Sequence, residues 1–395
     1  MTQNLFSIRN MQTDGKKTFL HDIFYDTIEN TFPIKHKFLQ ELTHDVAQLS
    51  LLLTKDRSMR KAVYLNDNAA LNAYLRYFLP WNVYRLCKLN LKEMLNIKNG
   101  DTIVDLGAGP LTMVLALRTA MPELLNLKLN FFCIDKNMKI MESGKKLFYA
   151  LDLKSGESAN WNITLIKGGF GERFSIPKAN LLCALNVCNE IFWNIHQADI
   201  PSLAIAAKKQ VAYFSSLVTA NGKVFVVEPG VPRCGQFLSL MRNSFLYDTD
   251  SFKIEAPCTH EKACPQSGGK RGSKWCHFTF STTDAPDKLC ALSAACALSK
   301  ERASLSFLLA AKNLNTCACG AGTGGTIPLR ITSDIIQLPS YLTGRYACYE
   351  GGLALVCGTK SKIEKYTCGT LLQAPLQCSI TKQIDKKSGA FIGHL

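Results

Sequence analysis

Short apolar runs alternate with longer helical patterns through the middle of the chain. In residues 101–250, and again just after residue 301, apolar residues form runs as short as buried strands, and amphipathic stretches separate them. Such alternation is typical of an α/β fold, in which helices cover both faces of a mostly parallel sheet. The expected strands are Thr102–Leu106, Leu129–Ile134, Thr164–Lys167, Ala179–Leu185, Val224–Val227 and Leu305–Ala311.

The flanks of this core have different patterns. Apolar residues recur at helical spacing before residue 100, whereas the chain after residue 250 is rich in cysteine, glycine and proline and then forms short β-like runs. We expect four parts: a helical N-terminal region (1–100), a core (101–250, resumed at about 301–315), a cysteine-rich insertion that binds a metal or cluster (251–300) and a small β-rich C-terminal region (316–395).

The first expected strand leads into a glycine turn. Gly107 and Gly109 can adopt turn conformations that residues with a Cβ resist, and Pro110 suits the first turn of a helix. The turn therefore offers bare backbone beside the exposed N–H groups of a helix N-terminus, where a small ligand can bind.

Two carboxylates near the turn indicate which ligand it suits. A dinucleotide site needs a third glycine where Thr112 stands, and Asp105 would repel a pyrophosphate. A cationic ligand would be attracted instead, and Asp135, after the second strand, is placed to accept hydrogen bonds from a ribose. The pair favours S-adenosylmethionine; the alternative is an unoccupied turn with Asp105 as a solvated cap.

Polar residues follow two later strands at the same edge of the sheet. Asn186, Asn189 and Glu190 come after the fourth strand and Glu228 after the fifth, where open α/β sheets bind their ligands. We expect these four to form the rim of the pocket, although Glu228 can also be only a turn cap. The apolar surroundings of Cys188 argue against a nucleophilic thiolate, so the sequence assigns no catalytic residue.

An aromatic stretch, Tyr74–Asn82, lies within a helical pattern at residues 67–95 and is followed by Arg85. Aromatic rings beside cationic side chains can stack on bases or line a groove beside a cofactor. An ordinary contact between a helix and the core is an equally good interpretation.

The second dense signal is a set of cysteines. The chain has 16, and in a reducing compartment they suggest metal or cluster chemistry. The wide spacing of Cys258, Cys264 and Cys276 fits a cuboidal iron–sulfur cluster better than a zinc knuckle. Zinc with His260 or His277 and a metal-free loop are the alternatives, and spacing does not fix a fourth ligand.

The formal net charge of +15 is concentrated in the two flanks, whereas residues 101–250 are nearly neutral. Basic flanks around a small-molecule core are typical of proteins that bind a phosphate backbone, although a merely basic, soluble surface is the alternative. Lys270, Arg271 and Lys274 are our candidates for RNA contacts. No apolar run is long enough to span a membrane, and the N-terminus has no secretory or transit pattern, so we expect a cytoplasmic protein.

Several motifs together resemble a known family. They are Asp105-Leu-Gly-Ala-Gly-Pro110, Asn189-Glu190, Glu228-Pro-Gly-Val-Pro232, Pro257-Cys258, Cys264-Pro265, Trp275-Cys-His-Phe278 and Gly344-Arg-Tyr-Ala-Cys348. Their order across residues 64–360 resembles the mitochondrial small-ribosomal-subunit assembly family of methyltransferase-like proteins, which also has bacterial members. The absence of a presequence-like pattern favours a bacterial member; a eukaryotic member would belong in the mitochondrial matrix.

This resemblance implies a fold, two cofactors and a partner. It implies a class I methyltransferase fold, a [4Fe-4S] cluster and binding to small-subunit ribosomal RNA during assembly, by a protein that we expect to be monomeric when free. By motif, the cluster ligands would be Cys258, Cys264, Cys276 and Cys348, and the S-adenosylmethionine loop would contain Asp105, Gly107 and Gly109.

Three functions follow as hypotheses. The first is an RNA-binding assembly factor that retains the methyltransferase fold without transferring a methyl group. The second is an active S-adenosylmethionine-dependent rRNA methyltransferase. The third is an iron- or redox-sensing RNA-binding protein. Leu111 favours the first, because methyltransferases commonly have a glycine there and a leucine side chain could crowd the methionine end of the cofactor.

Overall fold

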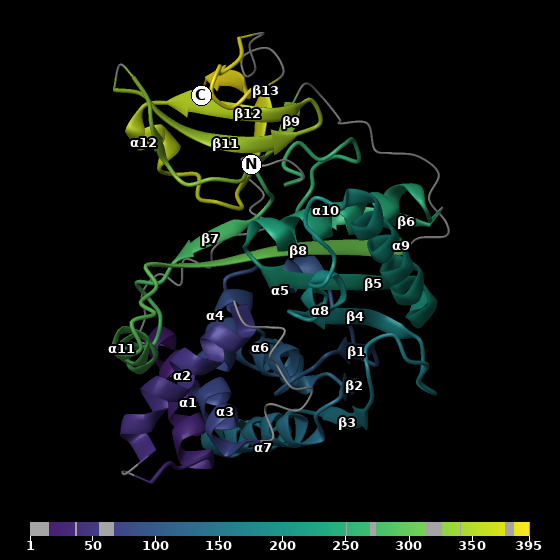
Figure 1. The fold of residues 1–395 in the computed structure, drawn as a ribbon, viewed down its shortest axis with the longest axis vertical. Helices are drawn as coiled ribbons and strands as arrows, with labels where there is room; N and C mark the ends of the chain where they lie inside the picture. The colour runs from purple at the N-terminus through teal and green to yellow at the C-terminus, as the bar shows by residue number, and fades with distance from the viewer. Residues whose placement is uncertain are drawn as a thin grey trace.

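A computed structural model describes the chain as two sheets with helices packed on the larger one (Figure 1). The described residues are 16–35, 38–54, 67–249, 251–268, 274–312, 326–339, 341–375 and 383–394. Two of the expected RNA contacts, Lys270 and Arg271, lie outside these ranges. No helix in the described part of the chain is both long and apolar enough to cross a membrane.

The central sheet has eight strands and positions the glycine turn. Its order is β3-β2-β1-β4-β5-β8-β6, and β7 also pairs with β8. Strands β1 to β5 are parallel to one another, whereas β8 runs antiparallel to β5, β6 and β7. The bounds are β1 Thr102–Leu106, β2 Leu129–Asp135, β3 Trp161–Lys167, β4 Ala179–Leu185, β5 Val218–Pro229, β6 Phe252–Ala256, β7 Phe278–Ser281 and β8 Arg302–Lys312.

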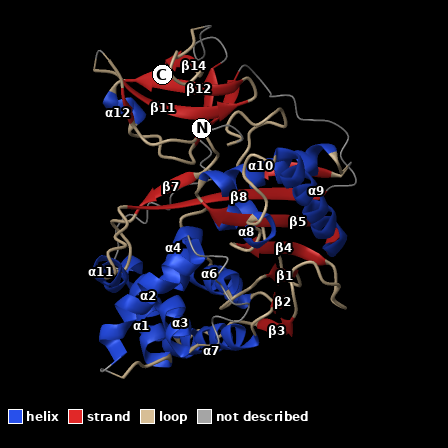
Figure 2. Ribbon diagram, in the orientation of Figure 1, coloured by secondary structure: helices blue, strands red, loops and turns tan. Residues whose placement is uncertain are grey.

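Helices cover both faces of this sheet because its strands are apolar on both sides (Figure 2). On β1, Ile103 faces one hydrophobic core and Val104 faces the other. One face is covered by α6 (Thr112–Ala120), α7 (Met138–Ser155) and the N-terminal helices, and the other by α9 (Ile200–Leu217) and α10 (Pro232–Tyr247). Shorter elements are the 3₁₀ helix η5 (Pro122–Asn126), α8 (Asn189–Phe192) and α11 (Asp287–Ala295).

The N-terminal part is helical where it is described. The helices are α1 (Lys16–Thr31), α2 (Leu39–Thr54), α3 (Asn68–Ala73), α4 (Leu79–Cys87) and α5 (Leu91–Leu95), and a π-helical turn, η4 (Tyr74–Phe78), joins α3 to α4. The chain forms two separate helices here, α1 and α2, because α1 ends before Pro33. The aromatic stretch occupies η4 and the start of α4.

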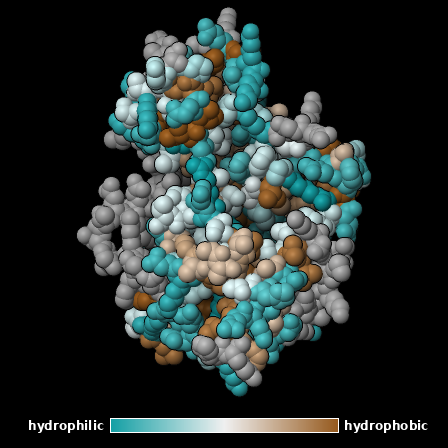
Figure 3. Space-filling model, turned by 60° about the vertical axis from the view of Figure 1, so that its left-hand side comes forward, coloured by the Kyte–Doolittle hydropathy of each residue, from teal (hydrophilic) through white to brown (hydrophobic). Residues whose placement is uncertain are grey.

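The C-terminal sheet has six strands and its own small cores. Its order is β13-β9-β11-β12-β14, and β10 pairs with β11. The bounds are β9 Thr326–Ile331, β10 Ile336–Gln337, β11 Thr343–Tyr349, β12 Gly352–Gly358, β13 Leu371–Pro375 and β14 Phe391–His394, with α12 (Lys360–Ile363) beside them. In Figure 3 this sheet forms the top of the molecule, where hydrophobic atoms gather among hydrophilic ones.

The range expected to be a cysteine-rich insertion, 251–300, also contributes to the central sheet. Strands β6 and β7 both come from this range and pair with β8. The loop that carries Cys258, Cys264 and Cys276 is thus held at both ends by strands of the core.

Candidate functional site

The turn between β1 and α6 has the geometry that its glycines predict. Gly107 and Gly109 have φ angles of 69° and 51°. A Cβ on Gly107 would lie only 2.5 Å from Val187 Cγ2, so the close approach of the next loop also requires glycine there. Leu111 follows with φ 58°, a left-handed conformation that is unusual for leucine.

Asp135 lies directly beside this turn. The backbone N–H of Gly109 donates to Asp135 Oδ2 (3.0 Å), and the N–H of Asn137 donates to Oδ1 (2.9 Å). Burial raises the pKa of Asp135, and these two hydrogen bonds oppose the rise. Asp135 thereby fixes the turn and presents a carboxylate to the adjoining cavity.

Asp105 is buried beneath the turn. It is 1% exposed, and neither of its carboxyl oxygens has a hydrogen-bond partner. In the sheet it pairs in register with Cys133 and Cys183, two buried thiols. Burial, with a smaller contribution from Asp135, raises the pKa of Asp105 to about 8. Asp105 and Pro110 do not line the cavity, in contrast to our expectation of direct contact with the ligand.

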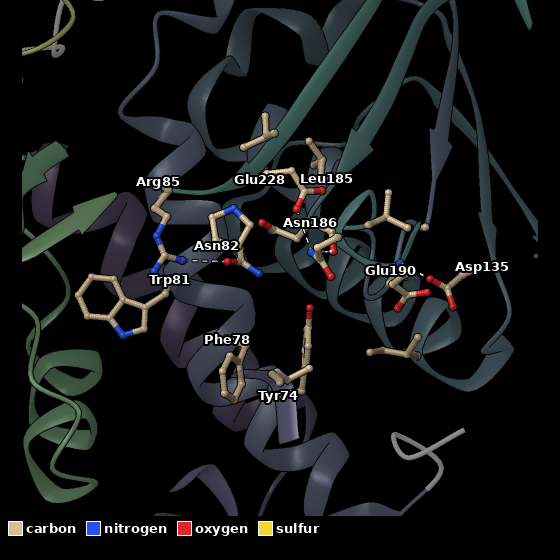
Figure 4. A pocket seen from close by; sticks show the side chains of 18 of the residues that line it. Tyr74, Phe78, Trp81, Asn82, Arg85, Asp135, Leu185, Asn186, Glu190 and Glu228 are labelled. Atoms are coloured by element: carbon tan, nitrogen blue, oxygen red, sulfur yellow. Dashed lines mark hydrogen bonds between the residues drawn. The ribbon is translucent and has the colours of Figure 1, made fainter. Parts of the chain in front are cut away.

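The expected rim residues meet at the carboxyl ends of β4 and β5 (Figure 4). The buried Glu228 accepts hydrogen bonds from the backbone N–H of Cys188 (2.8 Å) and from Asn189 Nδ2 (2.9 Å). Asn186 has a positive φ of 56°, and Glu190 faces the same space as Asp135. Burial raises the pKa of Cys188 well above its usual value, which agrees with the expectation that it is not a thiolate.

These groups line a cavity of about 510 Å³, a size typical of small-molecule sites. The residues that we expect to bind the cofactor are eight: Asp105, Gly107, Gly109, Pro110, Asp135, Asn186, Asn189 and Glu190. All of them except Asp105 and Pro110 line the cavity. The opposite wall comes from the N-terminal helices. Residues there that line the cavity are Tyr74, Tyr77, Phe78, Trp81, Asn82 and Arg85.

Lys300, two residues before β8, also lines the cavity and was not predicted. It lies far from the motifs in sequence and belongs to none of them. The sequence gives no specific signal for it, because a lysine a few residues before an expected strand is usually solvated.

The four cysteines expected to bind a cluster come together between the two sheets. Cys258 follows β6, Cys264 and Cys276 lie on the loop before β7, and Cys348 is on β11. Burial raises the pKa of Cys276 well above its usual value, and the other three thiols raise it further. No group of three or more His, Cys, Asp or Glu side chains in the described ranges is arranged to hold a metal ion.

Cationic and neutral donors surround these thiols. Arg242 Nε donates to Cys258 Sγ (3.1 Å), and Cys348 Sγ lies 3.3 Å from His260 Nε2. Burial lowers the pKa of Arg330 to about 9, and the nearby cysteines oppose this shift because they favour the charged guanidinium. Arg242 Nη1 is buried without a hydrogen-bond partner.

Lys274 is placed differently from our expectation of an RNA contact. Its Nζ lies 2.8 Å from the centre of the Tyr346 ring and is buried without a hydrogen-bond partner. Burial lowers its pKa to about 8. Lys274 therefore joins the loop to the C-terminal sheet and does not present its charge to solvent.

A family model matches part of the chain. Residues 202–336 match a family model described as "Rsm22: Mitochondrial small ribosomal subunit Rsm22". The chain is similar to the Rsm22 family. This confirms the resemblance that the motifs indicated. The Rsm22 match includes Glu228 and three of the four cysteines, whereas the glycine turn and Cys348 lie outside it. No curated protein matched the sequence.

Solved structures resemble the chain at low identity. One is assigned to the class I S-adenosylmethionine-dependent methyltransferases of Listeria monocytogenes (11% identity, 78% of this chain and 92% of that chain, TM-score 0.39). Another is precorrin-6y C5,15-methyltransferase from Geobacter metallireducens (10% identity, 58% of this chain and 87% of that chain, TM-score 0.33). The expected α/β fold class is confirmed: the central sheet is mostly parallel, and helices cover both of its faces.

Proposed function

We propose that this protein is a small-ribosomal-subunit assembly factor that binds rRNA and S-adenosylmethionine and contains a [4Fe-4S] cluster. The observation that carries this proposal is the match of residues 202–336 to the Rsm22 family model. The basic charge balance of the chain agrees with an RNA partner, because cationic side chains gain affinity by displacing counterions from phosphates.

The cavity supports a nucleoside cofactor with a positive charge. Gly107 and Gly109 provide backbone that a ligand can approach closely, and the N-terminus of α6 is adjacent. Asp135 and Glu190 place two carboxylates in the cavity wall, where they would attract an amino group, a sulfonium or a ribose diol. Leu111 does not obstruct this end, because its side chain is buried in the core and does not line the cavity.

The cysteine set supports a cluster by its chemistry. Cys258, Cys264, Cys276 and Cys348 supply four thiols, and Arg242 and Arg330 can offset the negative charge that thiolates and sulfide bring. The partnerless Nη1 of Arg242 fits an acceptor supplied by a bound group. A single zinc ion is the alternative, and it would need the sulfurs within one tetrahedral shell at about 2.3 Å. When bound, the cluster would join the loop, β6 and β11.

A methyltransferase reaction is the second candidate. The cavity continues past the expected cofactor residues to the aromatic wall, which leaves space for a second ligand beside the methyl donor. Proximity and orientation would then supply most of the rate enhancement.

Two measurements on anaerobically purified full-length protein test these proposals. We expect visible iron–sulfur absorbance, with iron and sulfide in equal amounts and little zinc, and calorimetric binding of S-adenosylmethionine. A colourless zinc protein would contradict the cluster and the redox-sensing hypothesis together.

A filter-binding assay then compares small-subunit rRNA with large-subunit rRNA at matched length and salt. Preferential binding of small-subunit rRNA supports the assembly role, and equal binding contradicts it. Transfer of a radiolabelled methyl group to the RNA would replace the non-catalytic interpretation with the enzymatic one.

A further inference from the structure

Two cationic side chains lie close enough to interact electrostatically in the cavity wall, on the side where Figure 4 shows Arg85 away from Asp135. Arg85, on α4, donates from Nη1 to Asn82 Oδ1 (2.9 Å), and its Nε is buried without a hydrogen-bond partner. Lys300 holds its Nζ 5.5 Å from the centre of the Tyr77 ring and 5.9 Å from that of Trp81. Both residues line the cavity.

No carboxylate within the described residues forms an ion pair with either cation. The charge that acts on Lys300 is the like charge of Arg85, which adds to burial in lowering the Lys300 pKa to about 8. Burial lowers the pKa of Arg85 to about 10. Two desolvated like charges destabilise the protein unless an anion offsets them.

The charges are distributed unevenly along the cavity. Asp135 and Glu190 line it at the strand ends, where Lys136 is their one cationic neighbour among the described residues of the lining. Glu228 is held by hydrogen bonds from Cys188 and Asn189. Arg85 lies on the far side of Asn186 and Asn82 (Figure 4). A ligand with a cationic group and a ligand with an anionic group would occupy opposite ends. The acidic end suits the proposed cofactor, so the basic end is available to a different molecule.

Aromatic side chains line the wall between the two ends. Tyr74 and Phe78 lie on the π-helical turn, with ring centres 5.6 Å apart and planes inclined by 30°. Both are only partly buried and point into the space beside Asn82 (Figure 4). Their ring faces and edges offer a surface for a planar ring, which stacks on aromatic side chains.

We propose that the Arg85–Lys300 end of the cavity is a phosphate subsite, and that its ligand is a nucleotide whose base lies against Tyr74 and Phe78. A phosphate offers several acceptor oxygens to the guanidinium and the ammonium and supplies the missing negative charge. The inference deepens the proposed function, on which it rests for the identity of the neighbouring cofactor. The nucleotide would enter beside the methyl donor.

The test uses the full-length protein saturated with S-adenosylhomocysteine, which removes the cofactor site from competition. Uridine 5′-monophosphate and uridine are titrated separately by calorimetry. We expect the monophosphate to bind at least about tenfold more tightly, because charge-assisted hydrogen bonds to phosphate stabilise only that ligand. Equal affinities would overturn the phosphate subsite.

Variants locate the effect. In Arg85→Gln and Lys300→Gln the preference for the monophosphate should fall to about twofold or less, since each variant removes one of the two cations. Lys92→Gln is the matched control, because Lys92 is an exposed lysine of the same helical region that pairs with Glu123. A preference retained in both cavity variants would overturn the inference.

The cofactor's own carboxylate is the competing anion. If it occupied this end, both variants would weaken S-adenosylhomocysteine binding and the monophosphate would fail to bind the saturated protein, which would overturn the inference. If S-adenosylhomocysteine does not bind at all, the proposed cofactor fails, and the same nucleotide titration on the free protein still decides the subsite.

A thermal shift keeps the inference testable if a variant does not fold. Inorganic phosphate should raise the melting temperature of the parent protein above its value in chloride of equal ionic strength, because the anion relieves the repulsion between Arg85 and Lys300. No rise would overturn the inference.

Discussion

Asp105 combines a central position in the sheet with a carboxyl group that has no hydrogen-bond partner. Its pKa is raised to about 8 in the folded protein, whereas a carboxyl group in the unfolded chain titrates near pH 4. Between these values the folded protein holds a proton that the unfolded chain releases. Stability is therefore greatest below about pH 4 for this group and is lost as the pH rises to about 8.

Asp105→Asn should remove this pH dependence. We expect the free energy of unfolding of the parent to fall relative to the variant by about 2–3 kcal/mol between pH 5 and pH 7, at roughly 1.4 kcal/mol per pH unit. Urea denaturation at the two pH values measures the difference. Glu93→Gln, at an exposed carboxylate of α5, is the control and should follow the parent. Parallel curves for Asp105→Asn and the parent would contradict the raised pKa.

Leu111 sets backbone strain against packing. Its φ of 58° costs about 1–2 kcal/mol for a residue with a Cβ, whereas its buried side chain contributes about 2–5 kcal/mol relative to alanine. We expect the parent to be the most stable, Leu111→Gly less stable and Leu111→Ala the least stable. Both variants lose the packing of the leucine side chain, but only Leu111→Ala keeps the backbone strain. Chemical denaturation of the two variants measures it, and Leu111→Gly more stable than the parent would contradict the balance.

At the residue scale, the sequence predicted conformations that depend on neighbouring residues, but it did not predict contacts between side chains that are distant in the sequence. The conformations of Gly107 and Gly109 follow from the turn itself, and the turn is readable from spacing. The proximity of Arg85 to Lys300 depends on how α4 packs near the segment before β8, and no local sequence pattern indicates this contact. The partnerless state of Asp105 likewise depends on the burial of its neighbours.

At the element scale, strands that are apolar on both faces were the easiest to predict. All six strands expected for the central sheet are present. Three begin at the expected residue, and the other three begin earlier, as β5 does at Val218. Strands β6 and β7 were missed because each is short and borders a loop dominated by cysteine, glycine and proline. The π-helical turn was also missed, because its residues have ordinary helical periodicity.

The cysteine loop is the element whose order should depend most on a bound group. Cys264→Ser should abolish iron binding and increase amide hydrogen exchange in residues 258–268 and 274–276, while β1, β4 and β5 stay protected, because ligand binding and loop folding are coupled. Iron analysis and hydrogen exchange measure both effects. Cys290→Ser, on α11 and outside the proposed ligand set, should change neither. Full iron content in Cys264→Ser would exclude this residue as a ligand.

At the scale of the whole molecule, the proposed cluster would lie where the C-terminal sheet meets the core. Cys348 on β11 approaches His260 of the loop, and Arg330 on β9 crosses the same boundary. The β-rich character of the C-terminal part was predictable from its strand-like runs. Its docking was not, because the contacts depend on single buried side chains from distant parts of the chain.

Arg330 offers the clearest test of that docking. It is 2% exposed, donates from Nε to Pro257 O (3.0 Å) and from Nη1 to Gly369 O (2.9 Å), and so ties β9 both to the end of β6 and to the segment before β13. Arg330→Met fills much of the same volume but leaves two buried carbonyls without these donors. The expected cost is at least about 2 kcal/mol, because each buried unsatisfied group costs about 1–3 kcal/mol.

The loss should fall on the C-terminal sheet before it reaches the core. Amides of β9, β11 and β12 should exchange faster in Arg330→Met than in the parent, whereas those of β1 and β4 keep their protection, since the central sheet has its own cores. Arg173→Met, at an exposed arginine, is the matched control and should leave exchange unchanged. Uniformly faster exchange in both sheets would mean that the two unfold together, and unchanged exchange would mean that Arg330 does not hold them.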